Sequence, residues 1–220
     1  MKMLSRIVCC ALAAFVLACG GPSPERVAEN LEKARDAERA GDFERARNYF
    51  QRVLDDAPLN AEALYGLGED QWRRGDRPAA RDYLTRALQS DDGHARANYR
   101  LARIIEDEGD ERRARSLYRR AIAEDPEMGD AYLRLAQLEY DEGNDAEAQR
   151  LFVEGLRRED DDPEAFYDFG KLLADMDRHR DAEGAFRSAL ELDEEYERAW
   201  YRLGNALREQ DRFFEALDAY

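Results

Sequence analysis

The sequence predicts an all-α fold in which helical hairpins stack into an α-solenoid, and two observations lead to this prediction. The first is a repeat of 34 residues that needs no gaps: repeats begin at residues 27, 61, 95, 129, 163 and 197, and the last is incomplete at residue 220. The second is helical spacing of apolar residues, as where Leu101, Ile104 and Ile105 share one helix face. A single hairpin cannot bury its apolar face alone, so neighbouring hairpins are expected to stack.

Four positions of the repeat stay in register across all six repeats. Small residues at positions eight and twenty let the two helices of a hairpin approach closely. Glycine at position fifteen is expected to adopt a positive φ at a helix C-cap, and position twenty-four is always large. The columns read Ala34, Gly68, Ala102, Ala136, Gly170, Gly204 at eight; Gly41, Gly75, Gly109, Gly143, Asp177, Asp211 at fifteen; Ala46, Ala80, Ala114, Ala148, Ala182, Ala216 at twenty; and Phe50, Leu84, Tyr118, Phe152, Phe186, Tyr220 at twenty-four.

Local signals indicate where helices begin. Asn60 and Asp162 stand just before first helices and are expected to cap them, and Pro78 lies near the first turn of a second helix. In the first repeat, polar residues such as Asn30 and Lys33 occupy apolar positions of later repeats. A terminal repeat has no upstream neighbour, so we expect this helix to act as a polar cap.

These columns resemble the tetratricopeptide repeat family. The resemblance is strengthened by a large residue at position four, Leu at seven, Ala at twenty-seven and Pro at thirty-two, as in Leu64, Leu67, Ala87 and Pro58. It covers residues 27–220 and implies a right-handed α-solenoid. It further implies a concave inner surface formed by positions two, five, six, nine, twelve and thirteen of the first helices, where protein or peptide ligands bind.

The first 26 residues read as a targeting segment. Lys2 and Arg6 precede a short apolar run, which is typical of a secretory signal peptide. The run ends in Val-Leu-Ala-Cys-Gly, which resembles the bacterial lipobox; the resemblance implies cleavage after residue 18, acylation (palmitate) of Cys19 and a tether over residues 19–26. It also implies a periplasm-facing outer-membrane anchor, because residue 20 is not Asp. The alternative is an ordinary signal peptide in which Cys19 has no role.

Composition excludes several functions. The chain has 50 Asp and Glu against 34 Lys and Arg, a net charge of −16, which argues against nucleic-acid binding. The three Cys lie in the first 20 residues, and His94 and His179 are expected to be solvated turn residues. The sequence contains no phosphate-binding glycine loop and no nucleophile–histidine pairing, so we expect neither a cofactor, a metal nor an enzyme.

The expected groove carries aromatic and basic residues. Tyrosines at position five suit peptide recognition, and arginines at positions two, six and nine pair well with carboxylates. The groove candidates are Tyr65, Tyr99, Tyr167, Tyr201, Arg96, Arg100, Arg103, Arg134, Arg198 and Arg202. Two alternatives remain open: the arginines bind an acidic or C-terminal peptide, or the nearby acids Glu62, Glu69, Asp130 and Asp168 neutralise them. Trp72 and Tyr140 either fill space beside polar position eleven or project into the groove.

The groove matches a known ligand site only in part. Co-chaperone members of the family hold a terminal carboxylate with Lys and Asn at set positions. Leu31, Arg35 and Gly66 depart from that pattern, and only Arg96 and Arg100 fit. At the other end, Phe213, Phe214, Leu217 and Tyr220 are expected to be poorly covered, as in a fragment or where a partner or self-association covers them.

The hypothesis that joins these features is a lipid-anchored scaffold of the bacterial envelope that binds proteins and helps to assemble or localise a larger complex. Short solenoids behind a lipobox resemble the pilotins of type IV pili, which is the first candidate, and also adaptors of murein enzymes or outer-membrane assembly. Two rivals are the recognition module of a longer enzyme and a soluble co-chaperone.

Overall fold

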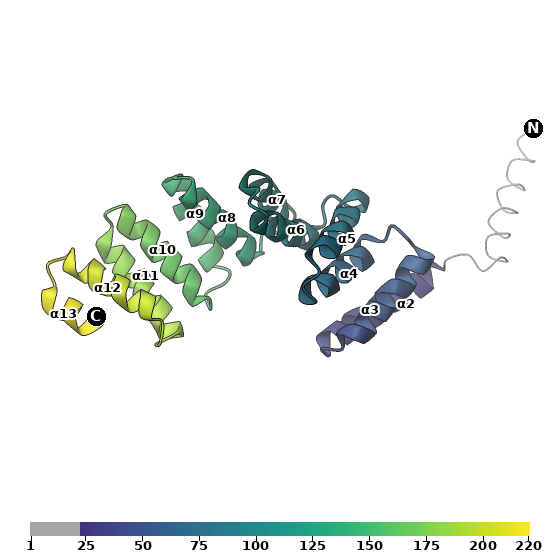
Figure 1. The fold of residues 1–220 in the computed structure, drawn as a ribbon, viewed down its shortest axis with the longest axis horizontal. Coiled ribbons are helices and arrows are strands. Elements are labelled where there is room, and N and C mark those ends of the chain that lie inside the picture. Colours follow the sequence, from purple (N-terminus) through teal and green to yellow (C-terminus); the bar gives the residue numbers. More distant parts are fainter. Residues whose placement is uncertain (1–22) are drawn as a thin grey trace, which may run out of the picture. The chain divides into compact units, whose positions relative to one another are not determined.

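The computed structural model describes residues 23–220, and all regular structure in that range is helical. The helices are α2 (Pro24–Arg39), α3 (Phe43–Asp56), α4 (Ala61–Arg73), α5 (Arg77–Ser90), α6 (Ala95–Asp107), α7 (Glu111–Glu124), α8 (Gly129–Asp141), α9 (Asp145–Leu156), α10 (Pro163–Asp175), α11 (His179–Leu192), α12 (Glu197–Arg208) and α13 (Phe213–Ala219) (Figure 1). The predicted all-α class is confirmed. Each repeat supplies two helices, as the spacing of apolar residues predicts.

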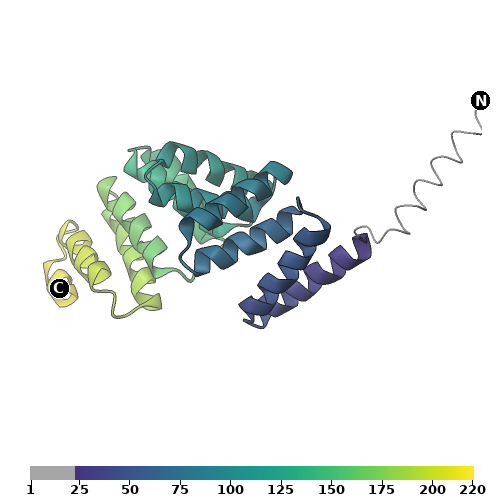
Figure 2. The same cartoon turned by 45° about the vertical axis from the view of Figure 1, so that its right-hand side comes forward.

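The chain divides into two compact units, the first ending at Ile104 and the second running from Ile105 to Tyr220. In the first unit, α2 pairs with α3 and α4 with α5, and α3 packs on α4. In the second unit, the hairpins are α8–α9, α10–α11 and α12–α13, and α7, α9 and α11 each pack on the first helix of the next repeat. Within each unit the hairpins stay side by side in both views (Figures 1 and 2). This consecutive packing is typical of a tetratricopeptide repeat solenoid.

Close approach at the small columns is confirmed. Alanines at position twenty are at most 3% exposed. A Cβ atom added to Gly170 in α10 would lie 2.6 Å from a ring carbon of Phe186 in α11, which is fully buried. Only the absence of a side chain at position eight therefore lets these two helices lie at their observed separation.

The turns inside the hairpins also follow the prediction. Gly41, Gly75, Gly109 and Gly143 have φ between 73° and 84°. In the last two turns an aspartate takes the same left-handed conformation, with φ of 58° at Asp177. An L-residue is disfavoured there, so this aspartate holds a backbone geometry that the hairpin imposes.

Helix starts agree with the predicted caps. Asn60 accepts a hydrogen bond from the backbone N–H of Ala63 at 2.9 Å, and Asp162 accepts one from Glu164 at 2.9 Å. Pro78 lies in the first turn of α5. One boundary differs, because α2 begins at Pro24, so residues 24–26 of the predicted tether are helical. The predicted signal peptide and Cys19 lie outside the described residues.

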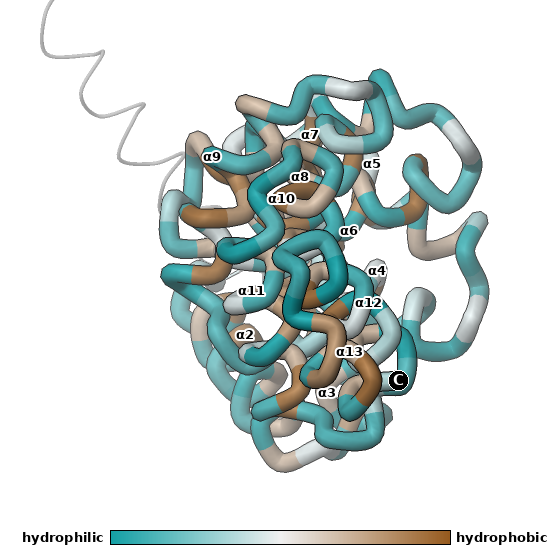
Figure 3. The backbone as a smooth tube through the Cα atoms, turned by 90° about the vertical axis from the view of Figure 1, so that its left-hand side faces the viewer, coloured by the Kyte–Doolittle hydropathy of each residue, from teal (hydrophilic) through white to brown (hydrophobic). Residues whose placement is uncertain are grey.

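The last hairpin exposes apolar side chains, as predicted. The exposed fractions are 56% for Phe213, 86% for Phe214, 70% for Leu217 and 57% for Tyr220. Apolar residues colour much of α13 in the hydropathy view (Figure 3). On its other side α13 is packed, because Ala216 and Ala219 are buried against α12.

Candidate partner-binding face

We call the surface that carries positions two, five, six, nine, twelve and thirteen of the first helices the first-helix face. Contacts between successive first helices place these positions side by side within each unit. Arg96 pairs with Glu62 at 3.0 Å in the first unit, and in the second unit Arg198 lies 3.6 Å from Glu164. The sequence candidates other than Cys19 occupy positions of this face, although Tyr167 is buried beneath it, and each unit presents its own portion of the face.

In the first unit, Tyr65 lies at the centre of a cluster. Its ring centroid is 4.9 Å from that of His94 and 4.9 Å from the guanidinium carbon of Arg96. His94 Nδ1 accepts the backbone N–H of Ala97 at 3.2 Å, so Nε2 carries the hydrogen and donates it to Glu62 at 3.2 Å. The expectation of a solvated turn histidine is wrong for His94, whose side chain is 10% exposed and caps α6.

The carboxylate of Glu62 holds this cluster together. The hydrogen bond from His94, with the charges of Arg96 and Arg35, outweighs burial and lowers the pKa of Glu62 to about 2. Burial raises the pKa of the Tyr65 hydroxyl above its usual range. Glu62 is therefore ionised at neutral pH, and its charge offsets that of Arg96.

A second pair neutralises the next arginine. Arg100 forms two hydrogen bonds to Glu69, one of them 2.9 Å between Nη2 and Oε2, and Glu69 is only 8% exposed. The guanidinium of Arg100 also lies 5.2 Å from the ring centroid of Trp72, so Trp72 lies on the first-helix face. Arg103 Nη1 is 3.4 Å from the hydroxyl of Tyr99. Of the two alternatives for the arginines, the structure shows neutralisation by acids at Arg96 and Arg100.

The predicted tyrosines of the second unit differ in exposure. Tyr167 is 7% exposed, and its ring centroid lies 6.0 Å from that of Phe186 and 5.2 Å from that of Tyr196. It belongs to the core and not to the open surface. Tyr201 is 60% exposed. The guanidinium of Arg198 covers the Tyr167 ring at 5.0 Å, which leaves Arg198 as the outer group at this point.

Tyr140 and Lys171 add two groups to this face. Tyr140 donates a hydrogen bond to Asp175, and the ammonium of Lys171 lies 5.5 Å from the Tyr140 ring centroid. Lys171 also bonds to Asp168 at 3.1 Å. Tyr140 is thus partly buried against side chains of α10, and whether it contacts a ligand stays a prediction. Lys171 was not predicted, although its place at position nine of the fifth repeat gave the signal.

Position eleven of the fourth repeat is filled by Glu139 itself. This carboxylate is 3% exposed, and it accepts hydrogen bonds from Arg119 at 2.6 Å and Asn144 at 2.7 Å. Arg119 belongs to α7 of the preceding repeat. A buried charge that is compensated in this way ties one hairpin to the next.

The first-helix face of the second unit contains a cavity of about 120 Å³ between α8 and α10. Arg134 lines it, together with Gln137, Asp130 and Asp168. Arg202, the remaining arginine candidate, lies at position six of α12 and is partly buried. Sequence reasoning named Arg134 and both aspartates but did not predict a cavity, because its volume depends on the offset between two helices.

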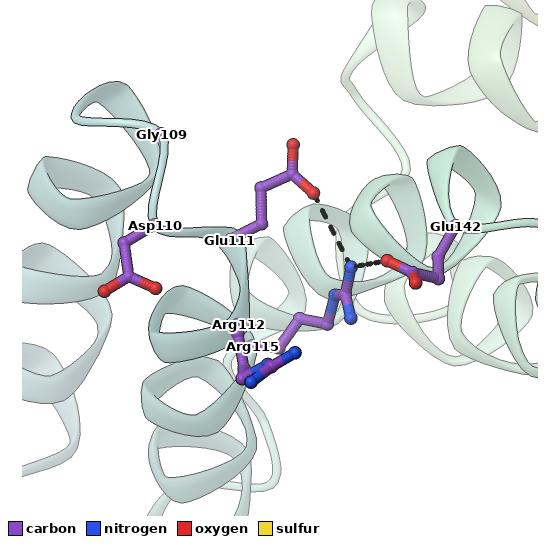
Figure 4. A pocket seen from close by; sticks show the side chains of 6 residues that line it. All are labelled: Gly109, Asp110, Glu111, Arg112, Arg115 and Glu142. Atoms are coloured by element: carbon purple, nitrogen blue, oxygen red, sulfur yellow. Dashed lines mark hydrogen bonds and ion pairs between the residues drawn. The ribbon is translucent and has the colours of Figure 1, made fainter.

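A larger and more open hollow, of about 540 Å³, lies at the hairpin turns of the same unit (Figure 4). Arg115 of α7 crosses it, lying 3.5 Å from Glu111 and forming an ion pair with Glu142 at the end of α8. Because Arg115 pairs with two carboxylates, one in its own helix and one at the end of α8, this hollow contains a polar contact between helices and not an open binding site.

Metal sites and membrane spans were sought among residues 23–220 alone. In this range no three or more His, Cys, Asp or Glu side chains gather as a metal site would require. Within the same range, no helix combines the length and the apolar composition of a membrane span.

Two family models described as tetratricopeptide repeat match the chain. One matches residues 106–167, and the other matches residues 31–69, 67–128 and 167–220, which is more than half of the chain. A comparison with curated proteins finds no match.

Solved structures with a similar fold include three further proteins. PilF of Pseudomonas aeruginosa aligns with a TM-score of 0.74 at 16% identity, over 89% of each chain. YrrB, described as a TPR protein with an unusual peptide-binding site, aligns with a TM-score of 0.69 at 19% identity, over 77% of this chain and 88% of its own. MamA of Desulfovibrio magneticus RS-1 has a TM-score of 0.63 at 18% identity, over 73% of this chain and 90% of its own. At these identities the likeness shows the fold alone.

Proposed function

The chain belongs to the tetratricopeptide repeat family, and from that premise we propose that it is a membrane-anchored scaffold that binds protein partners through its first-helix face. The observation that carries the proposal is the repeated presentation of aromatic and charged groups on this face. In the first unit these are Tyr65 and Arg96, and in the second Arg198 and Tyr201. Rings and guanidinium groups dominate protein interfaces because they bury a large area and still form directed hydrogen bonds.

The binding half of the proposal is tested by photo-crosslinking in intact bacterial cells. A photoreactive residue replaces Tyr201, which is 60% exposed on the first-helix face, and in a matched control it replaces Val153, which is 48% exposed on the second helix α9. We expect one partner to be captured from position 201 and not from position 153. Equal capture from both positions, or none from position 201, would refute binding through this face.

The anchor half rests on Val16, Leu17, Ala18, Cys19 and Gly20, whose order resembles the lipobox. Acyl chains on Cys19 would hold the scaffold at a membrane, since two or more chains anchor stably where one does not. We expect Cys19→Ser to abolish palmitate labelling and to release the chain from the membrane fraction. An unlabelled wild-type chain, or a variant that still sediments with membranes, would remove the anchor from the proposal.

As the role of the scaffold we propose assembly or localisation of an envelope complex, with a pilotin-like role as the first candidate. Its support is the combination of a lipobox with a short array of repeats. The crosslinked partner decides between the candidates: a secretin-type ring protein supports the pilotin-like role, and a murein enzyme supports an adaptor role.

A further inference from the structure

The cavity between α8 and α10 differs in character from the rest of the first-helix face. Its volume of about 120 Å³ is roughly four times the share of liquid volume that one water molecule occupies. That is room for the end of one long side chain. All of its lining residues belong to the second unit, so its geometry does not depend on the first.

The floor of the cavity is apolar. Leu133 of α8 and Phe152 of α9 line it, and they are 8% and 1% exposed. Such a floor suits the methylene stem of a long side chain whose charged end stays near polar groups.

One wall carries a buried hydrogen-bond acceptor that lacks a donor. Gln137 Nε2 donates to Asp141 at 2.8 Å, but Gln137 Oε1 is buried and accepts no hydrogen bond in the structure. Asp130 is exposed and forms no ion pair among residues 23–220; its carboxylate lies beside another acid, Glu159, whose pKa is raised by burial and by the charge of Asp130. A buried acceptor without a donor is unfavourable, so a ligand that brings N–H groups gains more here than on an open surface.

The remaining lining residues make the cavity acidic. Asp162, Glu164 and Asp168 join Asp130, and Arg134 is the one basic residue that lines the cavity. Cations also lie outside the lining, where Lys171 is 3.1 Å from Asp168 and Arg198 is 3.6 Å from Glu164. Even so, burial keeps the pKa of Asp168 above its ordinary value against the effect of Lys171. The carboxylates are therefore only partly compensated.

We propose that this cavity receives a basic side chain, lysine or arginine, of the partner protein, an inference that rests on the proposed function. The cationic end donates to Gln137 Oε1 within the acidic lining, and the methylene stem packs on Leu133 and Phe152. An acidic side chain would meet one guanidinium and several like charges. The stretch of the face around Arg134 thus selects for a basic residue, in contrast to the acidic peptide that a count of groove arginines suggests.

The test uses the purified chain and arrays of random nonapeptides with a fixed central residue. We expect central Lys or Arg to bind about tenfold more tightly than central Ala, since hydrogen bonds to charged groups are the stronger class, and central Glu to bind more weakly than Ala. Equal binding of Lys and Ala, or a preference for Glu, would overturn the proposal.

Two variants separate a site for a cation from a site for an anion. Asp130→Asn removes a carboxylate that has no ion pair to break, and we expect it to lower the preference for Lys several-fold. Arg134→Gln removes the one cation of the lining, and we expect it to leave binding of Lys peptides equal or tighter. Weaker binding after Arg134→Gln would show an anion site. The control Glu124→Gln removes an exposed acid at the end of α7, and urea midpoints verify that all three variants fold.

Two further measurements identify the source of the cation and distinguish failure of this inference from failure of the proposed function. Putrescine supplies the same chemistry without a peptide; if it binds as tightly as the Lys peptides, a free polyamine and not a partner is the ligand, and the proposal is overturned. If the arrays bind without regard to the central residue while position 201 still crosslinks a partner, this inference fails and the proposed function stands. If the arrays show no binding and position 201 captures no partner, both this inference and the proposed function fail.

Discussion

Substituting alanine at two glycines of one hairpin should change stability in opposite directions. Gly170 lies in α10 at position eight, where an added Cβ would come within 2.6 and 2.7 Å of ring carbons of Phe186. Gly184 lies in α11, and an added Cβ there meets nothing within 4 Å. Both substitutions gain the same helix propensity, so the difference between them isolates the cost of overpacking.

The magnitudes follow from these contacts. Replacing glycine by alanine in a helix gains about 0.8–1 kcal/mol. Overpacking of a well-filled core costs about 1–3 kcal/mol, and Phe186 is fully buried, which points to the upper part of that range. We therefore expect Gly170→Ala to destabilise the chain by roughly 1–2 kcal/mol and Gly184→Ala to stabilise it by up to about 1 kcal/mol.

The assay is urea unfolding followed by far-ultraviolet circular dichroism, compared through midpoints because stacked repeats need not unfold in one step. We expect the midpoint to fall for Gly170→Ala and to rise for Gly184→Ala. A Gly170→Ala chain as stable as Gly184→Ala would show that the two helices separate at little cost, so that the glycine would not be what sets their distance.

Three further predictions concern single residues. Because the pKa of Glu62 is lowered to about 2, its charge stabilises the fold fully at pH values above its unfolded pKa. That contribution, at most about 2 kcal/mol after screening, is lost as pH falls from about 4.5 to 2. Glu62→Gln should therefore remove this part of an acid-unfolding curve. Asp177→Gly should raise the thermal midpoint by relieving a left-handed L-residue, a gain of up to about 1 kcal/mol. Asn60→Ala should cost about 1 kcal/mol in urea unfolding, because the Ala63 N–H loses its cap.

Each of these has an outcome that would contradict it. An acid-unfolding curve unchanged by Glu62→Gln would mean that the contact with His94 does not hold the carboxylate. A lower thermal midpoint for Asp177→Gly would mean that the aspartate side chain contributes more than its backbone costs. Asn60→Asp keeps a capping oxygen, so it serves as the control for Asn60→Ala, and equal losses in the two variants would exclude the cap as the cause.

The sequence was sufficient for whatever depends on spacing within one repeat. The 34-residue period and the columns of small residues predicted the hairpins, and the positive φ of Gly41 matches the C-cap that its glycine predicts. The cap at Asn60 follows from one residue type directly before a helix. These features are local, so residue identity and offset decide them.

Features that depend on how one repeat packs on the next could not be predicted from the sequence. His94 reads as a turn residue, yet Glu62, 32 residues earlier, accepts its hydrogen bond. Tyr167 falls at a groove position, but Tyr196 and Phe186 enclose it. Helical periodicity assigns a residue to a face; it does not give the offset between neighbouring helices, which decides whether that face is open, filled or hollow.

The compensation of Glu139 limits how freely the repeats could be rearranged. Its buried carboxylate depends on Arg119 from the hairpin before it and on Asn144 from its own turn. Excising the third repeat would bring the uncharged Thr85 into the place of Arg119. The buried carboxylate of Glu139 would then lack its ion-pair partner, which would destabilise the fold by about 3–5 kcal/mol. Hairpins that look interchangeable in the periodic pattern are thus not equivalent as neighbours of the fourth repeat, and recombining them at random would favour joints that keep an arginine at this place, as Arg119 does and as Arg187 of the fifth repeat could.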